Sequence, residues 1–108
     1  MLTIRGIDHV VLRVRDIERM RKFYCDVLGA SHVAYRPGRE GRNMDHLCLK
    51  VEPFDQDAIV AHLKKHGVAV GDIKNRFGAE GNGVSIYLVD PEGNAVELKG
   101  PSDGRETP

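Results

Sequence analysis

Apolar and polar residues alternate over residues 3–14 and again over residues 44–51, and this period of two is typical of β-strands. The two stretches contain nearly the same octet, IDHVVLRV and MDHLCLKV, with a histidine in third place in each. A helical pattern follows both octets, over about 17–28 in the first case and within DQDAIVAHLKKHG in the second. The chain therefore predicts a strand–helix unit that occurs twice.

The second unit is followed by more strand patterns than the first. Residues 68–74, 83–90 and 94–99 each predict a strand, and the turn DPEGN joins the last two into a hairpin. The glycine-rich segment NRFGAEGNG at 75–83 is interpreted as a loop or lid, since its glycines do not match a phosphate-binding motif. Only ASHVAYRPGREGRN separates the first helix from the second octet, which leaves room for one short strand, SHVAYR, and a loop.

Strand alternation separates the histidines from the aliphatic side chains, because successive residues of a strand point to opposite faces. His9 shares its face with Arg13, and His46 shares its face with Lys50. Glu97 likewise points away from the aliphatic residues of the last strand. We expect each aliphatic face to pack beneath the helix of its own unit. Two imidazoles and one carboxylate can hold a divalent metal with positions left open, although such residues also occur as ordinary strand histidines and surface charges.

Composition sets limits on the class of protein. The chain has 108 residues, 41% of them hydrophobic, which is a length typical of one domain. Its 16 basic and 16 acidic residues balance, so we expect no nucleic-acid partner and no anionic membrane partner. The first residues lack the order of a signal peptide. Cys25 and Cys48 fit no CxxC pattern, which favours reduced thiols in a cytoplasmic protein.

Three segments taken in order resemble the vicinal oxygen chelate superfamily, whose members include glyoxalase I, bleomycin-resistance proteins, extradiol dioxygenases and fosfomycin-resistance enzymes. They are GIDHVVLRVRD…FYCDVLG, MDHLCLKVE and SIYLVDPEGNAVELKG, and the resemblance covers about residues 4–100. In that superfamily two βαβββ modules pair into a cup around a divalent metal. The resemblance implies an α+β fold with one glyoxalase-like domain over 1–100. A shortened module over 1–43 would lack about two strands, and a full module would cover 44–100. The apolar-free tail over 101–108 is expected to be disordered.

The resemblance also implies roles for individual residues. His9, His46 and Glu97 match the superfamily's metal ligands, and these are the residues that strand alternation places on one side. The metal could be Fe, Mn, Ni or Zn, since such a ligand set suits several ions. The implied function is a lyase, dioxygenase or transferase in which the metal chelates neighbouring oxygens of a small substrate. The alternative is a metal-free protein that sequesters a small ligand, as the bleomycin-resistance members do.

Further residues on the cup side are candidates for substrate contact. Arg13 and Lys50 could meet an anionic group or be rim charges, and Arg76 is a candidate in the glycine-rich segment. Tyr87 could hydrogen-bond an oxygen of the substrate or simply pack. The shortened module would leave sheet edges that need covering, so we expect a homodimer, either with or without exchange of strands between the two chains.

Overall fold

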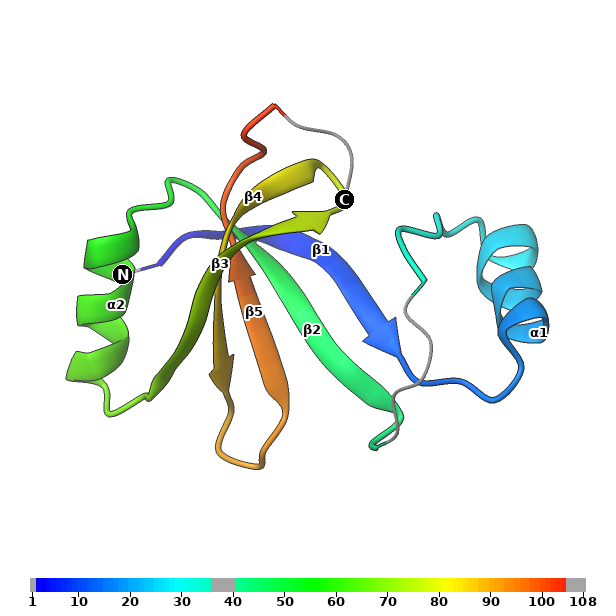
Figure 1. Ribbon diagram of the computed structural model, residues 1–108, viewed down its shortest axis with the longest axis horizontal. Coiled ribbons are helices and arrows are strands. Elements are labelled where there is room, and N and C mark those ends of the chain that lie inside the picture. Colours follow the sequence, from blue (N-terminus) through cyan, green and yellow to red (C-terminus); the bar gives the residue numbers. More distant parts are fainter. Residues whose placement is uncertain (1, 36–40, 105–108) are drawn as a thin grey trace.

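Five strands form one mixed sheet in which the two histidine strands are neighbours (Figure 1). The computed structural model describes residues 2–35 and 41–104. The sheet order is β1-β2-β5-β4-β3; β2 and β5 run parallel, and the other neighbours are antiparallel. The strands are β1 (Ile4–Leu12), β2 (Met44–Val51), β3 (Val70–Gly78), β4 (Gly81–Val89) and β5 (Ala95–Lys99). The α+β class and the expected strand starting at Met44 are confirmed.

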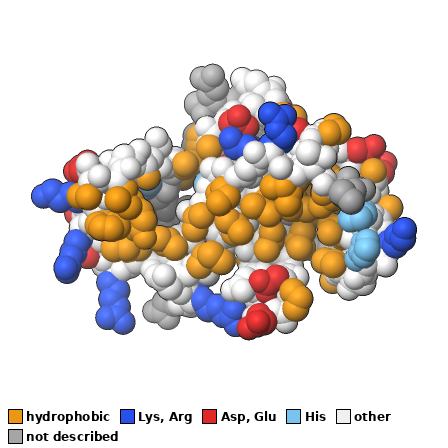
Figure 2. All heavy atoms as spheres, turned by 180° about the vertical axis from the view of Figure 1, so that it is seen from behind, with side chains coloured by type: hydrophobic (Ala, Val, Ile, Leu, Met, Phe, Trp, Pro, Cys, Tyr) orange, Lys and Arg blue, Asp and Glu red, His pale blue; other side chains and the backbone are white. Residues whose placement is uncertain are grey.

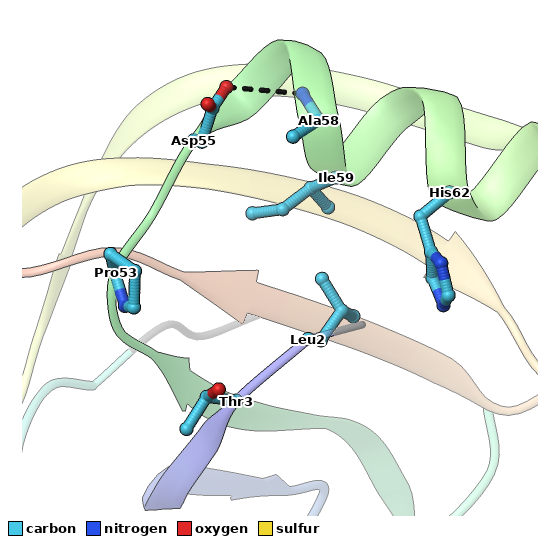
Figure 3. Close-up of a pocket in the computed structure, with 7 residues that line it drawn as sticks. All are labelled: Leu2, Thr3, Pro53, Asp55, Ala58, Ile59 and His62. Atoms are coloured by element: carbon cyan, nitrogen blue, oxygen red, sulfur yellow. Dashed lines mark hydrogen bonds between the residues drawn. The ribbon is translucent and has the colours of Figure 1, made fainter.

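Helix α2 (Gln56–Lys65) covers the aliphatic face of the second unit. Its N-cap is Asp55, whose side chain accepts a hydrogen bond from the Ala58 N–H (Figure 3), and Gly67 with φ +74° lies just after its end. Two buried helix residues meet buried residues of the three central strands to form the core, which consists of Val51, Ile59, Leu63, Ile86 and Leu98. For this unit the expected packing of aliphatic face beneath helix is confirmed.

The first helix does not pack in this way. It begins at Asp16, whose side chain caps it, and runs as α1 (Ile17–Arg21) and then as a π-helical segment, η1 (Lys22–Val27), close to the predicted range. None of its residues is buried, and Figure 1 shows α1 standing away from the sheet. The radius of gyration is 14.7 Å, against about 13 Å for a compact chain of this length. The expectation that α1 would pack on its own unit is wrong, because β1 alone offers too narrow a face for an apolar stripe.

The glycine-rich segment is a hairpin and not the loop that its composition suggested. Residues 70–78 form β3 and residues 81–89 form β4, with Ala79 and Glu80 as the turn between them. Glycine weakens strand propensity, but here it serves close approach. A Cβ on Gly78 would lie 2.5 Å from Asp8 Oδ1, so the tip of this hairpin can reach across the sheet to β1 only without a side chain there.

The remaining segments follow the strands without adding regular structure. Residues 31–35 form no strand, so the short strand SHVAYR is not found within the described residues, and Arg36 lies outside them. The expected disordered tail begins with residues held against β3 and β4, since Asp103 hydrogen-bonds Asn82 and Asn75; residues 105–108 lie outside the described residues. Among the residues described, no helix has the length and apolarity needed to cross a membrane.

Candidate metal centre

The strand register brings residues from four strands into one row. His9 on β1 pairs with Cys48 on β2, Cys48 pairs with Glu97 on β5, and Glu97 pairs with Tyr87 on β4. Residues directly opposite each other in neighbouring strands point to the same face. His46 lies on that face as well, two residues before Cys48. The face opposite to α2 therefore carries a dense polar cluster.

The three predicted ligands lie in contact. The two Nε2 atoms of His9 and His46 are 3.2 Å apart, and Glu97 Oε1 is 3.6 Å from the first and 3.2 Å from the second. Glu97 and His46 are buried, with exposures of 1% and 8%. Strand parity alone had placed these residues on one side; the structure brings their ligand atoms to within 4.8 Å of one another.

Each imidazole is oriented by the aspartate that precedes it. His9 Nδ1 lies 2.6 Å from Asp8 Oδ1, and His46 Nδ1 lies 2.8 Å from Asp45 Oδ1. A carboxylate at Nδ1 accepts the proton of that nitrogen and leaves Nε2 with a lone pair directed at the centre. The repeated dipeptide Asp-His therefore encodes two equivalent, oriented ligands. In β1 a register irregularity between Ile7 and His9 allows Asp8 to be buried next to its histidine.

The electrostatics of the cluster favour a positive charge at its centre. Burial raises the pKa of Glu97, but the hydrogen bond from His46 and the charges of both imidazoles outweigh it and hold the pKa below its usual range. Burial lowers the pKa of His46, yet its bonds to Glu97 and Asp45 raise the pKa overall. Glu97 Oε2 is buried without a hydrogen-bond partner among the described residues. Such an orphaned acceptor needs an explanation, and a cation is one.

The spacing of the ligand atoms fits one metal ion. Atoms bound about 2.1 Å from an ion lie about 3.0 Å apart at a right angle and about 3.4 Å apart at a tetrahedral angle. The observed separations are 3.2, 3.2 and 3.6 Å. Two Nε2 lone pairs and a carboxylate oxygen at these distances repel one another unless a proton or a metal lies between them. The residues present therefore fit a divalent ion that takes three ligand atoms from the protein.

The predicted substrate contacts lie around this centre at different distances. The Tyr87 hydroxyl is 3.2 Å from His46 Nε2, and burial beside the Glu97 charge raises the pKa of Tyr87 to about 12. Arg76 lies over the Tyr87 ring, 4.4 Å from its centroid, and donates to Ser85 Oγ at 2.6 Å. These residues are thus brought together, and Tyr87 carries its proton at neutral pH.

The other two candidates are already engaged. Arg13 forms an ion pair with Asp45 at 2.7 Å and donates to the Arg42 carbonyl, so that it supports the carboxylate behind His46. Lys50 lies 3.6 Å from Glu80 at the tip of the β3–β4 hairpin. Both are on the expected face, but neither reaches the three ligand atoms.

Four residues of the cluster were not singled out from the sequence: Asp8, Asp45, Cys48 and Lys99. The two aspartates belong to the repeated octets, and their position directly before each histidine could have indicated their role. Strand alternation places Cys48 on the same face as His46. Its position opposite Glu97 depends on the β2–β5 pairing, which the sequence does not reveal. A separate pocket between the start of β1 and α2 (Figure 3) is lined mainly by aliphatic residues and His62, and lies away from this cluster.

The opposed pKa shifts of Glu97 and His46 predict how the metal-free protein responds to pH. The raised pKa of His46 stabilises the fold below about pH 6.5 and loses this effect as pH rises through that pKa. The lowered pKa of Glu97 stabilises the fold above about pH 4.5, and this stabilisation is lost as pH falls through the pKa of the folded state. We expect urea unfolding of metal-free protein to show most of this stabilisation between those values, and Glu97→Gln to flatten the profile. Stability that increases steadily from about pH 6 to 8 would contradict this assignment.

Comparison with known proteins identifies related sequences. A family model described as Glyoxalase/Bleomycin resistance protein/Dioxygenase superfamily matches residues 6–54. "Glyoxalase domain-containing protein RDO1" of Mycosarcoma maydis is 30% identical, over 96% of this chain and 73% of that protein. "Virulence protein STM3117" of Salmonella typhimurium is 29% identical, over 90% of this chain and 85% of its own length.

A solved structure is similar in fold. The crystal structure of the Mn(II)-bound glyoxalase from Novosphingobium aromaticivorans superposes with a TM-score of 0.74 at 20% identity. All of this chain is covered, but it spans only 43% of that chain. The alignment with the Mycosarcoma protein runs over 130 residues, and this chain has 108, so at least 22 positions of that relative face gaps here. Relatives are therefore longer within the matched region, as expected of a shortened module.

Proposed function

Because the chain belongs to the Glyoxalase/Bleomycin resistance protein/Dioxygenase superfamily, we propose that it is a divalent-metal-dependent enzyme acting on a small substrate with two neighbouring oxygens. The observation that carries this proposal is the triangle formed by His9 Nε2, His46 Nε2 and Glu97 Oε1, with each imidazole oriented by an aspartate. Similarity to a Mn(II)-bound glyoxalase supports the fold in which such a site would work.

The residues around the triangle would have distinct tasks. A metal held by His9, His46 and Glu97 would act as a Lewis acid toward the substrate oxygens. Asp8 and Asp45 fix the imidazole tautomers, and Arg13 holds Asp45 in place. The Tyr87 hydroxyl lies next to His46 and keeps its proton, so it can donate a hydrogen bond to a substrate oxygen at the centre. The lyase, dioxygenase or transferase chemistry depends on the substrate.

Metal binding by the purified protein tests this proposal. Metal-free protein titrated calorimetrically with Mn(II), Fe(II), Ni(II) or Zn(II) should bind one ion per chain with at least micromolar affinity. Binding should release protons at mildly acidic pH, because ions compete with protons for the imidazoles. A chain that binds none of these ions would contradict the enzyme proposal and favour the metal-free, ligand-sequestering alternative.

We also propose that the chain forms a homodimer through its first unit. The stripe on α1 and η1 is unburied, with Val27 at 69% and Phe23 at 49% exposure. On β1, Ile7 and Val10 are 61% and 47% exposed, and within the described residues this strand pairs only with β2, at the edge of the sheet. Figure 2 shows hydrophobic side chains gathered both at the α1 end and across the sheet. A two-fold axis would allow each helix stripe to cover the partner's β1 face, so that both exposed apolar surfaces become buried.

Substitution of Val27 by glutamate tests this interface. Val27 is exposed in the single chain, so Val27→Glu should leave the fold intact but convert a dimer into a monomer, as measured by light scattering after size exclusion. Arg19→Glu on the same helix is the matched control, because it changes charge outside the apolar stripe. A wild-type protein that stays monomeric at about 100 μM would refute the dimer proposal, since standard interfaces bind well below that concentration.

A further inference from the structure

Lys99 is a buried cation whose ammonium group has no hydrogen-bond partner among the described residues. The residue is 1% exposed, and its Nζ makes no hydrogen bond with the residues that the structure describes. Buried ammonium groups are almost always paired, because leaving water without a compensating contact is unfavourable. An unsatisfied group of this kind in a native fold commonly marks the position of a ligand or an ordered water. The proposed metal ligands do not account for it.

Lys99 lies on the same face as the metal cluster. It follows Glu97 by two residues on β5, so the two side chains point the same way, and their Cα atoms are about 7 Å apart. Its neighbours in the sheet are Lys50 on β2 and Ser85 on β4. Lys50 is engaged by Glu80 at 3.6 Å, whereas Lys99 extends beneath the hairpin.

Gly78 makes room for this side chain. A Cβ on Gly78 would lie 2.9 Å from Lys99 Cε, whereas a Cβ on Gly83 would meet the Pro101 carbonyl oxygen at 2.6 Å before it met Lys99 Nζ at 3.3 Å. A side chain at position 78 would crowd the lysine, so this glycine of the β3–β4 hairpin allows Lys99 to reach its observed position. This arrangement keeps the ammonium beside the cluster rather than letting it extend to solvent, where Lys usually lies.

The hairpin tip that covers Lys99 is held by a small number of polar contacts. The Ala79 N–H donates to Asp8 Oδ1 at 2.9 Å, and Glu80 meets Lys50 at the rim. Glu80 is 49% exposed at its side chain, so its ion pair contributes little to keeping the tip closed.

With both imidazoles neutral, as metal binding requires, the other charges around the centre balance before an ion is counted. Asp8, Asp45 and Glu97 supply three negative charges, and Arg13, Arg76 and Lys99 supply three positive ones. A divalent ion held by the ligand triangle would leave this region with an excess of two positive charges. A bound anion restores the balance, and Lys99 is the cation among these three that has no hydrogen bond or ion pair with the described residues.

We propose that Lys99 binds the anionic group of the substrate, so that the substrate is a small oxyacid, with a carboxylate or phosphate-type group beside the two oxygens that face the metal. This inference rests on the proposed metal-dependent function, but the anion site itself belongs to the protein and exists without metal. Lys50, which from the sequence could meet an anionic group or be a rim charge, then acts at the rim by holding Glu80.

Binding of inorganic phosphate and of acetate to metal-free protein tests the site. Lys99→Met keeps the length of the side chain and removes its charge. This substitution should reduce the affinity for the preferred anion at least tenfold, as measured by calorimetry. Lys99→Arg should retain most of the affinity. Lys74→Met is the matched control, because Lys74 is a lysine on β3 whose side chain is 68% exposed. The affinity of this variant for the anion should be unchanged. The preference for phosphate or acetate distinguishes the two anion classes.

A measurement on the wild-type chain avoids dependence on the stability of variants. With ¹⁵N-labelled lysine, the Lys99 side-chain resonance should shift on addition of the anion while that of Lys74 does not. A folded Lys99→Met variant with unchanged anion affinity, or an unshifted Lys99 resonance, would overturn the inference. Parallel titration with Mn(II) separates the two proposals. If the protein binds metal but its anion binding does not depend on Lys99, only the oxyacid-substrate proposal is wrong. If it binds no metal, the enzyme proposal is wrong.

Discussion

His46→Ala is expected to reduce the affinity for divalent metal by more than about 100-fold. Substitution of groups that merely orient a ligand typically costs 10–100-fold, so removal of the ligand itself should cost more. His46 Nε2 is the atom closest to both other ligand atoms, at 3.2 Å from each. Its loss would leave one imidazole and one carboxylate, which is too few for a defined site. Calorimetric titration with Mn(II) and Zn(II) measures the change.

A graded series makes this result specific. Asp45→Asn keeps the shape of the side chain but weakens the orientation of His46, so it should reduce metal affinity about 10–100-fold. His62→Ala removes an imidazole from α2, on the other face of the sheet, and should leave the affinity unchanged. If His46→Ala binds metal as well as His62→Ala does, the ion lies elsewhere and the His9–His46–Glu97 site is wrong.

The grouping of His9, His46 and Glu97 on one face could be predicted from the sequence because period-two alternation is insensitive to register, whereas their role as metal ligands was implied by the family resemblance and stays a prediction. Whatever the partner strands, His9 and His46 point away from the aliphatic residues of their own strands, and so does Glu97. What alternation cannot supply is which strands are adjacent. The β1–β2 and β2–β5 pairings place the three residues on neighbouring strands, and these pairings depend on contacts between residues far apart in the chain.

Two predictions failed for physical reasons that local sequence does not reveal. NRFGAEGNG was predicted to be a loop because glycine has low strand propensity. Gly78 is nevertheless required where Asp8 and Lys99 pass close to the hairpin, and Gly83 is required where the backbone of residues 100 and 101 does. Helix α1 was correctly located from its apolar stripe, but its packing was not, since a stripe indicates that a partner surface exists without saying on which chain it lies.

The contrast between the two units connects fold and function. In the second unit, strand pairing and α2 packing form a complete core, and β2 and β5 of this rigid part supply His46 and Glu97. In the first unit only β1 is integrated into the sheet, and it supplies His9 and Asp8. The candidate metal centre therefore lies between β1 of the first unit and β2 and β5 of the second, and a bound ion would tie β1 to the rest of the sheet.

Ile86→Ala is expected to destabilise the fold by about 2–5 kcal/mol, a large part of the roughly 5–15 kcal/mol typical of single domains. Ile86 is fully buried at the centre of a core that has four other buried hydrophobic members among the described residues, so few fully buried side chains can shift to fill the cavity. Ile73 is its cross-strand partner on β3 and is 37% exposed, which makes Ile73→Ala a control with the same chemical change. That variant should lose about half as much, because less apolar surface is removed from contact.

Urea unfolding of both variants, followed by circular dichroism, measures the difference. Metal added in excess should recover part of the stability of Ile86→Ala, because an ion bound only by the folded chain shifts the equilibrium toward it. Equal losses for the two substitutions would mean that the sheet face beneath α2 is not the dominant core. Most of the stability would then come from surfaces that a single chain leaves exposed, mainly those of α1 and β1. Folding would in that case be inseparable from dimer formation.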